Sequence, residues 1–102
     1  MNLNSANSSL DSKTRQVREL VIQNQYGIHA RPAAMFVKTA SKYQADVTVE
    51  KGSMKVSGKS IMGLMTLEAG NGVSVKVSAE GADAEQLLDE LQKLVEQKFY
   101  EE

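Results

Sequence analysis

One stretch organises this chain: Tyr26-Gly27-Ile28-His29-Ala30-Arg31-Pro32-Ala33-Ala34. It contains the only histidine and the only proline of the 102 residues, and it lies where a β-like segment gives way to a helix-like one. Pro32 lacks an N–H group and has a restricted φ, which suits the first turn of a helix. His29 is therefore expected just before a helix N-terminus, where free N–H groups and the helix dipole favour an anion.

The residue types around His29 point to phosphoryl chemistry. Arg31 adds a permanent cation that can bind phosphate oxygens. A histidine beside it could act as a nucleophile and carry a phosphoryl group on a ring nitrogen. A lone histidine in a small protein is more often an ordinary surface residue, but its position next to Arg31 and Pro32 at a strand-to-helix junction favours the phosphoryl hypothesis.

Two segments carry a family resemblance. Gly27-Ile28-His29-Ala30-Arg31-Pro32-Ala33 resembles the active-site signature of HPr, the histidine-containing phosphocarrier family of the phosphoenolpyruvate-dependent phosphotransferase system. Lys59-Ser60-Ile61-Met62-Gly63-Leu64-Met65-Thr66-Leu67 resembles the second helix of that family with its regulatory serine. The two segments occur in the family's order and spacing, and the resemblance covers about residues 15–100.

Hydrophobic periodicity predicts a β-α-β-β-α-β-α order, with elements at residues 16–23, 32–43, 46–51, 54–56, 60–67, 73–78 and 84–99. Two β-α-β halves indicate an α+β fold with an antiparallel sheet and helices on one face. The resemblance implies an HPr-like open-faced β-sandwich with four strands in the order 1-4-2-3 and three helices on one face. We expect residues 1–13, rich in Ser and Asn, to form a disordered tail, and residues 14–102 to form the HPr-like domain.

The periodicity also predicts the core and the ends of the helices. Leu20 and Ile22 should point inward from the first strand, and the first helix should bury one stripe of apolar residues. The last helix should be capped by Asp83, with Glu101 and Glu102 forming a solvated acidic end. The predicted core stripe of the first helix consists of Ala33, Phe36, Val37 and Ala40.

For the site, the resemblance implies that His29 accepts a phosphoryl group through Nδ1 from phosphorylated enzyme I and passes it to enzyme IIA. Arg31 would balance the phosphoryl charge. The chain would then be a phosphocarrier and not a self-sufficient enzyme, and it would need no cofactor of its own. Partners would dock around His29; the predicted docking residues are Ala30, Ala34, Lys38, Ile61, Met62 and Met65. For Ile61, Met62 and Met65, burial in the core is an equally acceptable interpretation of the sequence.

Two positions depart from one common form of the family pattern, since Ala30 stands where some members have Thr and Tyr26 where Asn is common. Ala30 does not separate the sugar branch from the nitrogen-related branch, so the choice between transport and a purely regulatory role stays open. The segment around Ser60 looks more like proteins regulated by HPr kinase/phosphorylase. Ser60 can act as a helix N-cap, as a phosphorylation site, or as both.

Composition excludes several other functions. A net charge of −1 gives no electrostatic reason to bind nucleic acid or a membrane surface. One histidine and no cysteine cannot build a typical multi-histidine zinc site or a disulfide, so we expect no metal.

Gly58-Lys59-Ser60 resembles the end of a P-loop, but the required first glycine is replaced by Ser53. The predicted strands lack stacking aromatics for RNA. Without an apolar run of ~20 residues or a signal peptide, a cytoplasmic monomer is expected.

Overall fold

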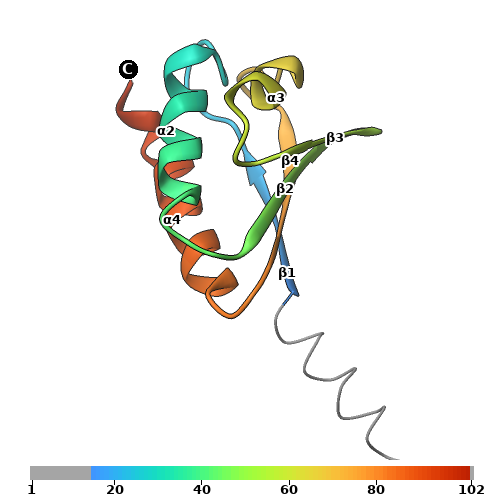
Figure 1. The fold of residues 1–102 in the computed structure, drawn as a ribbon. Helices are drawn as coiled ribbons and strands as arrows, with labels where there is room; N and C mark the ends of the chain where they lie inside the picture. Colours follow the sequence, from blue (N-terminus) through green and yellow to red (C-terminus); the bar gives the residue numbers. More distant parts are fainter. Residues whose placement is uncertain (1–14, 102) are drawn as a thin grey trace, which may run out of the picture.

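The computed structural model describes residues 15–101, and the tail predicted for residues 1–13 lies outside them. The elements follow the predicted order, with a short 3-10 turn added at the C-terminal end (Figure 1). Their bounds are β1 Arg15–Val21, α2 Ala30–Ala40, β2 Asp46–Lys51, β3 Met54–Ser57, α3 Ile61–Thr66, β4 Ser74–Glu80, α4 Ala84–Glu96 and η1 Lys98–Tyr100.

The four strands form one antiparallel sheet in the order β1-β4-β2-β3, which confirms the predicted order 1-4-2-3. The register pairs Leu20 with Val75 and Val49 with both Val77 and Val56. Because side chains alternate along a strand, this register gathers the apolar residues on one face of the sheet.

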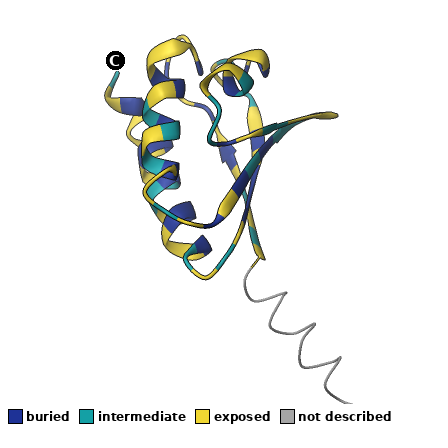
Figure 2. Cartoon of the chain, viewed as in Figure 1, coloured by how far each residue is buried: buried dark blue, intermediate teal, exposed yellow. Residues whose placement is uncertain are grey.

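One face of the sheet carries the core, and α2 and α4 cover it (Figures 1 and 2). Both residues predicted to point inward from the first strand are buried, since Leu20 is 6% exposed and Ile22 is 1% exposed. The opposite face has no helix over it among the described residues, and most strand residues that alternate with the buried ones are exposed or half-buried (Figure 2). The fold is therefore an open-faced α+β sandwich, as predicted.

Helix α2 differs slightly from its prediction. It begins at Ala30, two residues earlier than expected, and it ends at Ala40 where residue 43 was expected. Pro32 is thus the third helical residue, still within the first turn, where a missing N–H group costs no helical hydrogen bond. Pro32 is buried, whereas Val37, predicted to belong to the core stripe, is only half-buried.

Three predictions for the C-terminal part of the chain are wrong. Strand β4 continues through Glu80, where an exit turn was expected after residue 78. Asp83 does precede α4, but its side chain does not cap the helix. Helix α4 ends at Glu96 and does not reach Phe99, because Lys98, Phe99 and Tyr100 all have positive φ angles of 56°, 54° and 60°. Phe99 is only 1% exposed, so its burial anchors this left-handed turn in the core.

Candidate functional site

A short loop between β1 and α2 sets the position of His29. The Ile28 N–H group donates to the Ala69 carbonyl at 2.9 Å, and the His29 N–H group donates to the Gly27 carbonyl at 3.0 Å. Gly27 has a φ of +70°, and a Cβ atom there would lie 2.4 Å from the Ala69 carbonyl oxygen. Only glycine therefore fits, and it fixes the path of the chain into His29.

His29 is the N-cap residue of α2, with extended backbone angles of φ −92° and ψ −166°. Its carbonyl accepts from the Ala33 N–H group at 2.9 Å, but its side chain makes no capping hydrogen bond. Pro32 has no N–H group, so the first turn offers the N–H groups of Ala30 and Arg31. The first turn holds no acidic residue. This helix end is consequently open to an anion placed beside the ring of His29.

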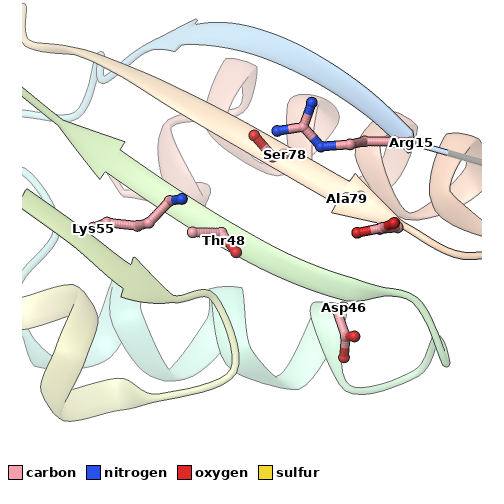
Figure 3. Close-up of a pocket in the computed structure, with 7 residues that line it drawn as sticks. Arg15, Asp46, Thr48, Lys55, Ser78 and Ala79 are labelled. Atoms are coloured by element: carbon pink, nitrogen blue, oxygen red, sulfur yellow. The ribbon is translucent and has the colours of Figure 1, made fainter. Parts of the chain in front are cut away.

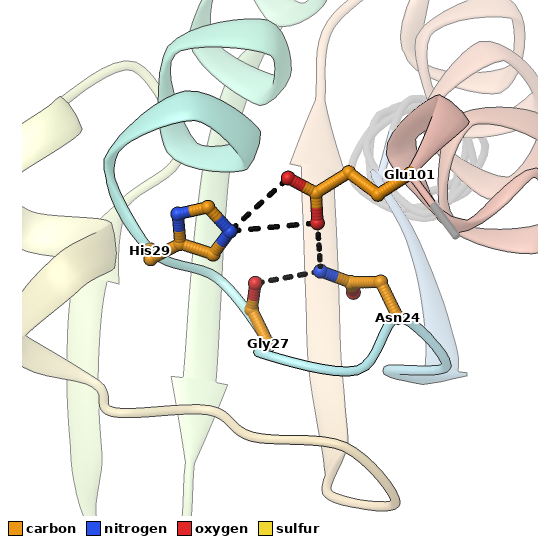
Figure 4. Close-up of polar contacts among 4 residues, drawn as sticks. All are labelled: Asn24, Gly27, His29 and Glu101. Carbon is orange, nitrogen blue, oxygen red and sulfur yellow. Dashed lines mark hydrogen bonds and ion pairs between the residues drawn. The ribbon is translucent and has the colours of Figure 1, made fainter.

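One ring nitrogen of His29 contacts the C-terminal segment (Figure 4). His29 Nε2 lies 3.1 Å from one carboxylate oxygen of Glu101 and 3.4 Å from the other. The side-chain amide of Asn24 donates to Glu101 at 3.0 Å and to the Gly27 carbonyl at 2.7 Å. The prediction that Glu101 is merely solvated is therefore wrong, while Glu102 lies outside the described residues.

The rest of the site is accessible. The His29 side chain is 43% exposed, and its second ring nitrogen points away from Glu101 (Figure 4). Tyr26 is exposed, and its ring lies edge-on to the imidazole with the two centroids 6.4 Å apart. Arg31 is also exposed, and it makes no ion pair with any residue between 15 and 101. Its guanidinium group is therefore available to a bound anion.

The predicted docking residues of α3 lie on the surface and not in the core. Ile61, Met62 and Met65 are 40%, 73% and 38% exposed, while Leu64 and Leu67 are fully buried. Helix α3 packs beside α2, near the end that begins after His29 (Figure 1). On α2 the other three predicted docking residues are exposed and follow one another at four-residue spacing, so they share one helix face; these are Ala30, Ala34 and Lys38.

Ser60 caps α3 as predicted. Its Oγ accepts a hydrogen bond from the Gly63 N–H group at 3.0 Å, and its backbone is extended. The neighbouring Lys59 Nζ donates to the Tyr43 carbonyl at 2.9 Å. The helix that follows Ser60 has only 6 residues, so the long helix required by a P-loop is missing here.

Away from His29, the carboxylates of Asp83 and Glu90 have structural partners. The carboxylate of Asp83 accepts from the backbone N–H groups of Gln44 and Ala45, both at 2.9 Å. The hydrogen bond from Gln44 is the main cause that lowers the pKa of Asp83 below its usual range. Hydrogen bonds from Lys42 and then Tyr43 likewise lower the pKa of Glu90, and the bond to Glu90 raises the pKa of Tyr43.

A separate hollow of about 150 Å³ lies on the open face of the sheet (Figure 3). It contains both cationic and anionic side chains, and neither His29 nor any residue of α2 or α3 lines it. It therefore has no part in the site at His29. Its lining residues are Arg15, Asp46, Thr48, Lys55, Ser78, Ala79 and Glu80.

Between residues 15 and 101, no group of three or more His, Asp or Glu side chains is placed to hold a metal ion. In the same range, none of the helices has the length and apolar character to cross a membrane.

Comparison with known sequences identifies one family. The family described as "PTS HPr component phosphorylation site" matches residues 16–97. The "Phosphocarrier protein HPr" of Borreliella burgdorferi is 42% identical over 79 residues, covering 78% of this chain and 92% of the relative. The "Phosphocarrier protein NPr" of Shewanella violacea is 38% identical over 88 residues, covering 86% of this chain and 97% of the relative.

Solved structures agree with this assignment. The crystal structure of HPr-C-His from Thermoanaerobacter tengcongensis superposes with a TM-score of 0.82 at 49% identity, covering 85% of this chain and 98% of the other. A structure described as an HPr dimer from the same organism has a TM-score of 0.69 at 52% identity, covering 78% of this chain and 92% of the other.

Proposed function

This chain belongs to the HPr family of phosphocarrier proteins of the phosphotransferase system, and from that premise we propose that His29 accepts a phosphoryl group from phosphorylated enzyme I and passes it to enzyme IIA. The phosphoryl group originates in phosphoenolpyruvate. The observation that carries the proposal is the open N-terminus of α2, where free N–H groups and an Arg31 without an ion pair to residues 15–101 flank an exposed imidazole.

The chemistry of a carrier requires this kind of site. A phosphohistidine has to form and break easily, so its oxygens need donors but not a deep pocket that binds them tightly. The N–H groups of Ala30 and Arg31 and the Arg31 guanidinium group supply donors on an exposed surface. We assign His29 as the nucleophile and Arg31 as the group that balances the phosphoryl charge. Neither role needs a metal or nucleotide bound to this chain.

Partner proteins would dock over the surface formed by α2 and α3 around His29. In this proposal the flexible side chains of Met62 and Met65 adapt to different partners, with Ile61 adding apolar area. Lys38, one of the exposed residues of α2, would meet acidic groups of a partner. The docking surface consists of Ala30, Ala34, Lys38, Ile61, Met62 and Met65.

Ser60 is proposed as a regulatory phosphorylation site for HPr kinase/phosphorylase. A phosphate on the N-cap residue of α3 lies at the positive end of the helix, so phosphorylation need not unfold it. Its charge would instead repel an acidic partner that approaches the docking surface. A Ser60→Asp protein should accordingly accept phosphate from enzyme I more slowly than the wild type, and equal rates would count against this role.

The protein is proposed to work as a cytoplasmic monomer, without binding nucleic acid and without stable insertion into a membrane. The relatives include both HPr and NPr proteins. A role in sugar uptake therefore has one alternative: a regulatory carrier that uses the same phosphoryl chemistry but signals through its phosphorylation state. The partners separate the two functions. Phosphoryl transfer to a sugar-specific enzyme IIA supports transport, and transfer only to proteins of a regulatory phosphotransferase chain supports signalling.

The direct test is phosphoryl uptake from phosphoenolpyruvate and enzyme I, measured by intact mass for the wild type and His29→Ala. Because His29 is the only histidine, an acid-labile added phosphate should appear in the wild type and be absent from the variant. An acid-stable phosphate in both proteins would instead indicate a phosphate ester on a hydroxyl side chain. If folded wild-type protein takes up no phosphate from several enzyme I proteins, the carrier function is wrong.

A further inference from the structure

The C-terminal segment turns back onto the loop that carries His29. Three successive residues with left-handed backbone angles, at 98–100, reverse the chain after α4, and buried Phe99 holds the reversal in place. L-residues rarely adopt this conformation, so three in a row indicate a turn imposed by packing. The turn places the Glu101 carboxylate 3.1 Å from His29 Nε2 (Figure 4).

A buried amide orients that carboxylate. Asn24 is 0% exposed, and its Nδ2 group divides its two hydrogens between the Gly27 carbonyl and Glu101. The Glu101 side chain is itself only 19% exposed. One oxygen of Glu101 is thus held by Asn24 while the other lies nearest His29, which leaves the carboxylate little freedom to turn away from the ring.

We propose that Glu101 is a positioning residue for His29, a role that rests on the proposed function. A neutral imidazole has one N–H group, and the hydrogen bond made by one ring nitrogen decides which nitrogen carries the proton. Glu101 accepts the hydrogen of Nε2. Nδ1 therefore keeps its lone pair free for phosphorus, and it lies on the side of the ring away from Glu101 (Figure 4).

The same carboxylate also balances charge during transfer. The Nδ1 lone pair forms the new N–P bond while the bond from phosphorus to the donor breaks and returns its electron pair to the donor. Nε2 keeps its hydrogen throughout, so the phosphorylated ring becomes cationic opposite Glu101. When the acceptor takes the phosphoryl group, the N–P pair returns to Nδ1 and the ring is neutral again. Glu101 stabilises the cationic ring in the same way that a buried carboxylate stabilises an imidazolium in other sites.

The first experiment determines which ring nitrogen of His29 carries the hydrogen, and it requires no phosphoryl transfer. Nitrogen-15 chemical shifts of the His29 ring at alkaline pH, where imidazole is neutral, should show the Nε2–H form in the wild type. Glu101→Gln should keep that form, because the amide oxygen still accepts the hydrogen. Glu101→Ala should give a mixture of the two forms. Glu96→Gln is the matched control, since it removes an exposed carboxylate near the same end of the chain without touching His29.

The second experiment measures the rate of phosphoryl uptake from enzyme I for the same proteins. The pair is partly exposed, so loss of charge balance should slow Glu101→Gln by about fivefold, and Glu101→Ala should be slower still. Asn24→Ala should lie between the wild type and Glu101→Ala; if it fails to fold, the Glu101 variants decide alone.

The outcomes separate this inference from the function on which it rests. If Glu101→Ala matches Glu96→Gln in both ring form and rate while the wild type accepts phosphate, the positioning role is wrong and the carrier function stands. If the ring form changes as expected but the wild type accepts no phosphate, the contact positions the ring but the proposed function is wrong.

Discussion

Helices α2 and α3 both begin with backbone N–H groups that have no partner within the helix, and the two ends differ in whether a side chain caps them. At α3, the hydroxyl group of Ser60 accepts a hydrogen bond from the N–H group of Gly63, the third helical residue, and we call this end closed because a side chain caps it. At α2, the third helical residue is Pro32, which has no N–H group, and the side chain of the N-cap residue His29 turns away to Glu101, so no side chain caps the first turn and we call this end open. The difference shows that the open end is not a requirement of helix formation in this chain.

A closed N-terminus stabilises its helix, whereas an open one keeps its donors for a ligand. The capping bond at Ser60 contributes to folding in every state of the protein. The uncapped N–H groups at Ala30 and Arg31 contribute fully only when an anion is present. We expect variants that close the α2 end to lose function without losing stability, and variants that open the α3 end to do the reverse.

The largest effect is expected when the α2 end is closed by an added carboxylate. Ala30→Glu places a negative charge in the first turn, where it competes with the phosphoryl group for the free N–H groups and repels it. Phosphoryl uptake should fall about 100-fold, while the free energy of unfolding stays equal or rises by about 0.5 kcal/mol. Uptake kinetics and urea denaturation measure the two quantities.

Ala82→Glu is the matched control for that variant, because Ala82 is exposed beside the start of α4 and far along the chain from His29. It adds the same charge near a helix N-terminus and should leave uptake unchanged. Equal losses in both variants would mean that net charge, and not the α2 end, governs the reaction with enzyme I.

A smaller loss is expected at Arg31, whose guanidinium group adds to donors that the backbone already provides. Arg31→Ala should slow uptake about tenfold, and Arg31→Lys should recover part of the rate, because Lys keeps the charge but not the planar set of donors. Arg15→Ala, an exposed residue at the start of β1, is the charge-matched control. If Arg31→Ala takes up phosphate at the same rate as the control, Arg31 has no role in phosphoryl uptake.

Opening the α3 end should affect stability instead. Ser60→Ala removes the acceptor for the Gly63 N–H group and should lower the free energy of unfolding by about 1 kcal/mol. Ser60→Asp, which can still accept that hydrogen bond, should lose less. Urea denaturation at neutral pH provides the comparison, and an unchanged unfolding midpoint for Ser60→Ala would show that the capping bond contributes little.

The smallest effect is expected at Asp83, which precedes α4 but binds the backbone of Gln44 and Ala45. Because these bonds lower the pKa in the folded state, the carboxylate stabilises the fold above its unfolded pKa of about 4, and this contribution disappears as the pH falls through the folded value. Asp83→Asn keeps one acceptor oxygen, so it should be modestly less stable at pH 7 and equal to the wild type in strong acid. Urea denaturation across pH values measures this, and a constant difference would contradict the linkage.

Much of the fold could be predicted from local patterns. Alternation along the strands, the turn at Gly52 and the cap at Ser60 each involve residues close in sequence, so their signals are visible without a structure. The predicted cap at Asp83 is wrong because it depends on distant contacts. Asp83 has the residue type and position of a helix cap, but no local pattern shows that its carboxylate lies within reach of the N–H groups of Gln44 and Ala45.

The same division holds at the candidate site. By itself, the sequence determined the element order, the histidine with its glycine, arginine and proline, and the family, because these depend on residue type and short spacing. Only the tertiary structure placed Glu101, 72 positions away in sequence, against His29 and set Asn24 behind it. No periodicity or motif records such a contact, since a left-handed turn anchored by the burial of Phe99 creates it.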